Sequence, residues 1–92
     1  MASVEMVLTN EETKALIPFG MICMTRYGSV WNTMRRKRRW KEEFTDSERT
    51  KASKLFQQAH NWTCVTGVPE TVRMKPSTYD LWQKLAAFCC SL

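Results

Sequence analysis

The sequence predicts a mainly α fold, in which residues 1–92 form a single domain: a small bundle of three to four helices, with or without a short strand near residues 70–75. Three observations support this prediction. A chain of 92 residues suits one domain. Hydrophobic residues make up 43% of it, and four Trp, two Tyr and four Phe supply enough apolar surface for a modest core. Apolar residues also recur at helical spacing in three separate stretches.

The N-terminal segment contains one short predicted helix. Residues 1–8 are expected to be flexible or extended. Thr9 or Asn10 can cap a helix that runs through Ile17, because the two glutamates that follow complement the helix dipole in its first turn. Pro18 is expected to end this helix, since the residue before a proline disfavours the helical conformation.

A second helix is predicted over residues 19–41. Apolar residues fall at positions 19, 22, 23, 27, 30, 31 and 34, which is the spacing of an amphipathic helix. Gly28 weakens this helix or marks a bend in it. Beyond Met34 the same face carries Arg38 and Lys41, so a continuous helix would leave the core there and project a charged end.

The third predicted helix, over residues 46–61, has the clearest start signal. The sequence from Thr45 to Glu48 has the capping-box pattern, in which a Thr and the Glu three residues later satisfy backbone N–H groups that lack partners within the helix. A stripe of apolar residues at helical spacing follows it: Ala52, Leu55, Phe56, Ala59 and Trp62.

Residues 63–76 are predicted to form a turn and then a short extended piece, because Gly67 and Pro69 interrupt a run of β-branched residues. A last helix is predicted to start at Ser77, where a Ser and the Asp three residues later, Asp80, resemble a capping box. Apolar residues cover more than half of its circumference, which favours a central position. The expected core side chains are Tyr27, Trp31, Leu55, Phe56, Leu81, Trp82, Leu85 and Phe88.

Positive charge is concentrated in one segment, Arg35 to Lys41, which reads RRKRRWK. The chain has fourteen Lys and Arg and nine Asp and Glu, and six of the cations lie in this segment. The remaining eight cations and nine acids leave the rest of the chain with a net charge of −1. Burial of unpaired charges costs several kcal/mol, so these side chains cannot all be inside.

This segment predicts a contact with an anionic partner. A Trp among Arg and Lys is typical of base stacking beside phosphate contacts, and Trp40 has this setting. Two alternatives remain: contact with an acidic protein surface, or a solvated helix end in which Trp40 folds back over Phe44 or the edge of the core. The predicted binding residues are Arg35, Arg36, Lys37, Arg38, Arg39, Trp40, Lys41, Arg73 and Lys75, with Arg26 as further support.

The stretch from Gly67 to Arg73 resembles the turn and the start of the recognition helix in helix-turn-helix proteins, whose second helix enters the major groove of DNA. The resemblance covers about seven residues and implies that residues 46–61 form the supporting helix. Pro76 departs from the pattern because it would cut the recognition helix short. The alternative is an ordinary connector.

The sequence predicts no enzyme, no cofactor and no metal site. His60 is the only histidine, and it could form a zinc site with Cys64 and the Cys89–Cys90 pair, but adjacent cysteines are poor co-ligands and core thiols are the better interpretation. No nucleophile–His–acid signature and no Gly-rich phosphate loop is present. Without a secretory signal the thiols are expected to be free.

The expected function is therefore binding, and the expected location is the cytoplasm. No membrane span is predicted, because no stretch reaches the roughly 20 apolar residues that a span needs. The first hypothesis is association with nucleic acid or a nucleoprotein complex through Arg35–Lys41. The second is a small regulator or inhibitor that docks on an acidic or nucleic-acid-binding surface of a protein target. In its size and lack of motifs the chain is similar to phage-encoded accessory proteins, including anti-CRISPRs. A homodimer is compatible with so short a chain.

Overall fold

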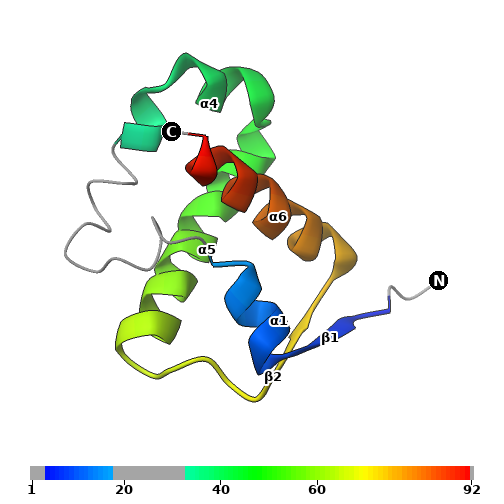
Figure 1. The fold of residues 1–92 in the computed structure, drawn as a ribbon. Helices are drawn as coiled ribbons and strands as arrows, with labels where there is room; N and C mark the ends of the chain where they lie inside the picture. The colour runs from blue at the N-terminus through cyan, green and yellow to red at the C-terminus, as the bar shows by residue number, and fades with distance from the viewer. Residues whose placement is uncertain (1–3, 18–32, 92) are drawn as a thin grey trace.

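The structure, a computed structural model, describes residues 4–17 and 33–91, and within them it is mainly α with one short two-stranded sheet (Figure 1). The predicted fold class is thus confirmed, and the strand expected near residues 70–75 is present. The elements in chain order are β1 (Met6–Thr9), α1 (Asn10–Ala15), α4 (Arg38–Glu43), α5 (Asp46–Cys64), β2 (Thr71–Met74) and α6 (Pro76–Cys90). Residues 33–36 are also helical.

The sheet joins the two halves of the chain. β1 and β2 are antiparallel, and Met6 pairs with Met74 while Thr9 pairs with Thr71. Leu8 and Met74 are buried on one face of the sheet. Of the two alternatives predicted for residues 1–8, residues 6–8 take the extended one, because a strand more than sixty positions away in the sequence supplies their hydrogen-bond partners.

The capping box at the start of α1 connects the sheet to the rest of the molecule. Thr9 is the N-cap: its side chain accepts from the backbone N–H of Glu12, whose carboxylate accepts from the backbone N–H of Thr9 at 2.9 Å. The Asn10 side chain donates to the backbone carbonyl of Val68 at 2.7 Å. The first helix thus begins where the sequence predicts. It ends at Ala15, just before the predicted end.

The predicted helix over residues 19–41 does not continue to its end. Residues 19–32, with Gly28, lie outside the described residues. Residues 33–36 are helical, but Lys37 has an extended backbone (φ −74°, ψ 135°) and is the N-cap of the separate short helix α4. The expected projecting helix end is therefore wrong. The break turns Trp40 and Phe44 toward the core, where their rings lie 4.7 Å apart between centroids.

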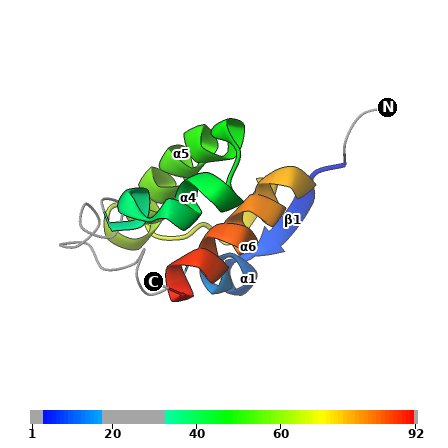
Figure 2. The same cartoon turned by 90° about the horizontal axis from the view of Figure 1, so that it is seen from above.

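The main packing contact is between α5 and α6. In the view of Figure 2, α6 lies below α5, and α1 is seen beside α6 at the lower edge. Phe56 and Leu85 are fully buried, and Trp62 stacks on Trp82 with 5.9 Å between centroids. The expected core residues Phe56, Leu81, Trp82, Leu85 and Phe88 are buried, and Leu55 is partly buried. Tyr27 and Trp31 lie outside the described residues.

The two long helices start differently. The capping box of Thr45 and Glu48 at the start of α5 is present as predicted. The box predicted from Ser77 to Asp80 is not the start of α6, since this helix begins one residue earlier with Lys75 as N-cap and Pro76 in its first turn. Proline suits that position because its fixed φ matches that of a helix, and because an N–H group there would have no acceptor within the helix. No helix within residues 4–17 and 33–91 has the length and apolar character needed to cross a bilayer.

Candidate functional site

The basic segment lies at one end of the molecule, on the helical residues 33–36 and on α4. All six of its cations are exposed. Arg35 and Arg36 precede the break at Lys37, and the other three follow it in α4. The break therefore distributes the charge over two short helical pieces that meet at an angle, instead of around one helix. We call these six side chains the basic surface: Arg35, Arg36, Lys37, Arg38, Arg39 and Lys41.

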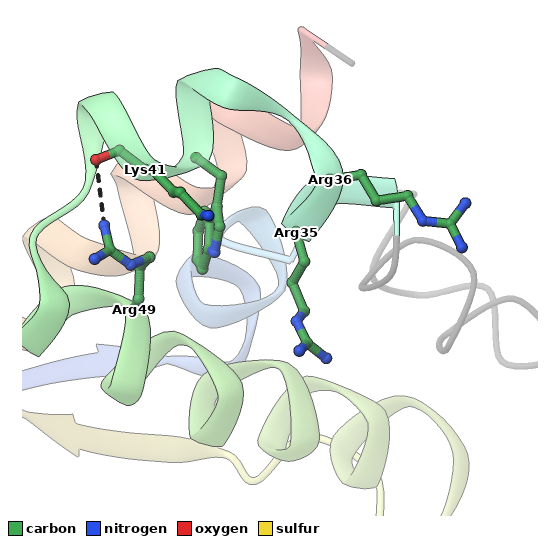
Figure 3. A pocket seen from close by; sticks show the side chains of 5 residues that line it. Arg35, Arg36, Lys41 and Arg49 are labelled. Carbon is green, nitrogen blue, oxygen red and sulfur yellow. Dashed lines mark hydrogen bonds between the residues drawn. The ribbon is translucent and has the colours of Figure 1, made fainter.

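Part of the basic surface surrounds a hollow between α4 and α5. The hollow has a volume of about 420 Å³ and is lined by Arg35, Arg36, Trp40, Lys41 and Arg49. Figure 3 shows the Arg35 side chain extending toward α5, whereas Arg36 extends away from it. Four of the five lining residues carry a positive charge, so the hollow attracts anions.

A second hollow of about 460 Å³ continues the first one along α5. It shares Arg35, Trp40 and Arg49 with the first hollow and reaches Asp46, Thr50 and Ser53 on α5. The basic surface and the exposed side of α5 thus form one continuous surface.

Arg49 fixes the position of α4 relative to α5. Its Nη1 donates to the backbone carbonyl of Phe44, and to that of Lys41 at 3.3 Å, the bond drawn in Figure 3. Its Nη2 donates to the carboxylate of Asp46. The last carbonyls of a helix lack partners within it, and Arg49 satisfies them for α4. No local pattern in the sequence indicates this role of Arg49, because its backbone acceptors belong to the preceding helix and not to its own.

Arg39 makes several contacts within the molecule. Its Nε donates to the Glu43 carboxylate at 2.5 Å and its Nη1 donates to the Ser91 hydroxyl at 3.2 Å. Its Cζ lies 5.2 Å from the centroid of the Phe88 ring. The hydrogen bond and the charge of Glu43 raise the pKa of Arg39, and the same bond lowers the pKa of Glu43. The contacts of Arg39 with Phe88 and Ser91 connect α4 to the C-terminal end of α6.

Trp40 does not offer a stacking platform, and this corrects the prediction that it stacks on bases. Only 5% of its surface is exposed. Its ring lies against Phe44 and against Phe88, whose centroid is 6.0 Å away. Burial of the large indole stabilises the domain more than exposure between cations would. The alternative in which Trp40 folds back over Phe44 and the core is the arrangement found.

Arg73 and Lys75 are not brought to the basic surface. Arg73 lies in β2 opposite Val7, and Lys75 is the N-cap of α6. Arg39 contacts the opposite end of α6, and a helix of 15 residues is about 22 Å long. Figure 1 accordingly shows β2 and α4 at opposite ends of the molecule. Arg26, the further supporting residue, lies outside the described residues.

The helix-turn-helix resemblance is not supported by the fold. Residues 71–74, which would begin the recognition helix, form the strand β2 and pair with β1. Gly67 has a positive φ of 80° and lies in the connector between α5 and β2. The ordinary connector, the alternative for this stretch, is thus the observed structure.

Titratable groups away from the basic surface are dispersed. Among residues 4–17 and 33–91, no three His, Cys, Asp or Glu side chains are grouped closely enough to hold a metal ion. Cys89 and Cys90 are free thiols. Burial, with a smaller effect of Cys90, raises the pKa of Cys89 to about 11, which keeps this thiol protonated at neutral pH.

Comparison with known proteins gives no relative from which a function could be inferred. No protein-family model matches the chain, and neither a curated protein nor a solved structure is similar to it.

Proposed function

We propose that this protein is a non-enzymatic binding protein whose basic surface contacts the phosphate backbone of nucleic acid, either free or in a nucleoprotein complex. The observation that carries the proposal is the cationic hollow between α4 and α5, to which Arg36, Lys41 and Arg49 contribute from separate elements. Convergence of cations on one concave surface focuses positive potential and raises the local concentration of polyanions.

The composition of the basic surface favours an electrostatic contact. Arg36, Lys37, Arg38 and Lys41 are exposed, and Trp40 is buried behind them. Each phosphate that a cation neutralises releases condensed counterions, so four such contacts would give a salt slope of about −3.6 on duplex DNA.

The proposal is tested with two double variants that remove equal charge. Arg36→Ala/Lys41→Ala removes two cations from the basic surface, and Arg73→Ala/Lys75→Ala removes two exposed cations from β2 and the start of α6. Binding to short random-sequence duplexes and single strands is measured by fluorescence anisotropy over a salt series. We expect the first variant to weaken binding and to reduce the salt slope by about two, while the second retains most of the affinity.

Two results would contradict the proposal. Wild-type protein that binds neither duplex nor single strand at low salt would remove nucleic acid as the partner, and it would favour an acidic protein surface. Equal losses in the two double variants would show that total charge matters and that the basic surface does not.

A further inference from the structure

The exposed side of α5 has the composition of a DNA-reading helix. Its outward residues follow one another at intervals of three and four positions and therefore lie on one face. Four of them are exposed and Asn61 is partly buried. None is hydrophobic and none is acidic. The residues of this outer face are Ser47, Thr50, Lys54, Gln57 and Asn61.

Acidic residues are missing from this part of the chain. Residues 49–69 contain Arg49, Lys51 and Lys54 and no Asp or Glu. Exposed helices in soluble proteins commonly alternate acids and bases, which pair at intervals of three or four residues. The two acids of α5, Asp46 and Glu48, are confined to its first turn, where they complement the helix dipole. The remainder of the helix can approach an anionic surface without repulsion from a carboxylate.

The outer face of α5 adjoins the basic surface. Thr50 and Ser53 line the same hollow as Arg35, so both features can touch one ligand. Asp46 also lines this hollow, and its carboxylate is paired with Arg49. The opposite side of α5 is anchored in the core by Ala52, Phe56 and Ala59, each 0% exposed. The helix has 19 residues and is about 28 Å long, which is long enough to follow a groove.

We infer that α5 lies in the major groove of duplex DNA, with Lys54, Gln57 and Asn61 at the base edges and the basic surface on the flanking phosphates. This inference rests on the proposed function. Asn and Gln amides pair with adenine through two hydrogen bonds, and Lys donates to guanine. The amide of Gln57 already lies 3.3 Å from that of Asn61. The major groove of B-form DNA admits a helix, whereas that of A-form RNA is too narrow, so the partner is duplex DNA.

A matched pair of glutamine variants tests whether α5 faces the DNA. Gln57→Glu places a carboxylate on the outer face, and Gln83→Glu places one on α6 beside α1. Both glutamines are exposed, and both donate to a side chain four residues away, Asn61 and Tyr79 respectively. We expect Gln57→Glu to lower affinity for duplex DNA by about tenfold or more, and Gln83→Glu by about twofold, with equal thermal midpoints.

Base reading is tested by selection from a pool of random-sequence duplexes. The wild type is expected to enrich a sequence motif, and Gln57→Ala/Asn61→Ala is expected to lose preference at the positions those amides read while keeping the salt slope. Two results would overturn this inference and leave the proposed function intact. The first is an equal effect of the two Glu variants on affinity. The second is that the protein binds duplexes through Arg36 and Lys41 but enriches no sequence motif. A wild type that binds no duplex would overturn the proposed function and the inference together.

Discussion

Arg39 of α4 lies over the ring of Phe88 in α6, with 5.2 Å between its Cζ and the ring centroid. The same guanidinium donates to Glu43 and to Ser91. Phe88 in turn contacts Phe44 and Trp40, with ring centroids 5.4 and 6.0 Å away. One cation of the basic surface thus joins the C-terminal end of α6 to α4.

Arg39 and its neighbour Arg38 are expected to affect different properties. Arg39→Ala removes contacts with Glu43, Phe88 and Ser91, so we expect it to lower the urea midpoint of unfolding more than Arg38→Ala does. Arg38 is exposed at the start of α4, and its loss should weaken nucleic-acid binding with little change in stability. Urea denaturation and anisotropy on both variants check this. Equal midpoints would contradict a structural role for Arg39.

Trp40 is predicted to stabilise the fold without contacting the ligand. Trp40→Ala should lower the free energy of unfolding by about 3–5 kcal/mol, because it leaves a cavity beside Phe44 and Phe88. Trp40→Phe retains an aromatic ring and should fold and bind nucleic acid like the wild type. Urea denaturation followed by circular dichroism gives the first result and anisotropy the second. A folded Trp40→Phe protein with greatly reduced affinity would revive base stacking on this residue.

Glu48 is predicted to make stability depend on acid pH. The backbone N–H of Thr45 and, more weakly, Lys84 lower the pKa of Glu48 from its ordinary value of 4.5. Its carboxylate therefore stabilises the fold at pH values above the unfolded-state pKa, and this contribution is lost as the pH falls through the folded-state pKa. We expect Glu48→Gln to reduce the fall in the free energy of unfolding between about pH 5 and pH 3. Glu70→Gln, a change of equal charge at an exposed position, is the control. Identical slopes in Glu48→Gln and the wild type would refute the assignment.

Gly67 is predicted to tolerate substitution poorly for conformational reasons alone. Its φ is +80°, and a Cβ built there would meet no atom within 4 Å. Gly67→Ala should therefore cost about 1–2 kcal/mol of backbone strain, and Gly67→Asn less, since Asn adopts positive φ more readily. Urea denaturation of both variants measures the difference. Equal stability of Gly67→Ala and the wild type would show that the turn can relax.

Cys89 is predicted to react more slowly than Cys90. Burial is the main reason that its pKa is raised to about 11, whereas Cys90 is exposed. Iodoacetamide at about pH 8 should label Cys90 first in the folded protein, and the difference should vanish in denaturant. Mass spectrometry of the labelled peptides gives both rates. Because the raised pKa favours the protonated thiol, its contribution to stability is lost as the pH rises toward 11. Equal labelling rates in the folded protein would contradict the burial of Cys89.

The sequence by itself determined the features that depend on neighbouring residues. The capping box of Thr45 satisfies N–H groups three residues away, so its pattern locates the start of α5 without any tertiary contact. A cap at Thr9 or Asn10, followed by two glutamates, likewise indicates the start of α1. The helical stripe from Ala52 to Ala59 likewise predicts the buried side of α5. The position of the positive charge is also a property of the sequence alone.

Only the tertiary structure decided where the charged segment points and what it lies beside. The break at Lys37 depends on the burial of Trp40 and Phe44 against Phe88, some fifty residues later in the sequence. β1 forms because β2 provides a partner, and Arg73 is held at the far end by that pairing. Hydrophobic burial and strand pairing join residues that are distant in the chain, so no local pattern could indicate which residues they bring together.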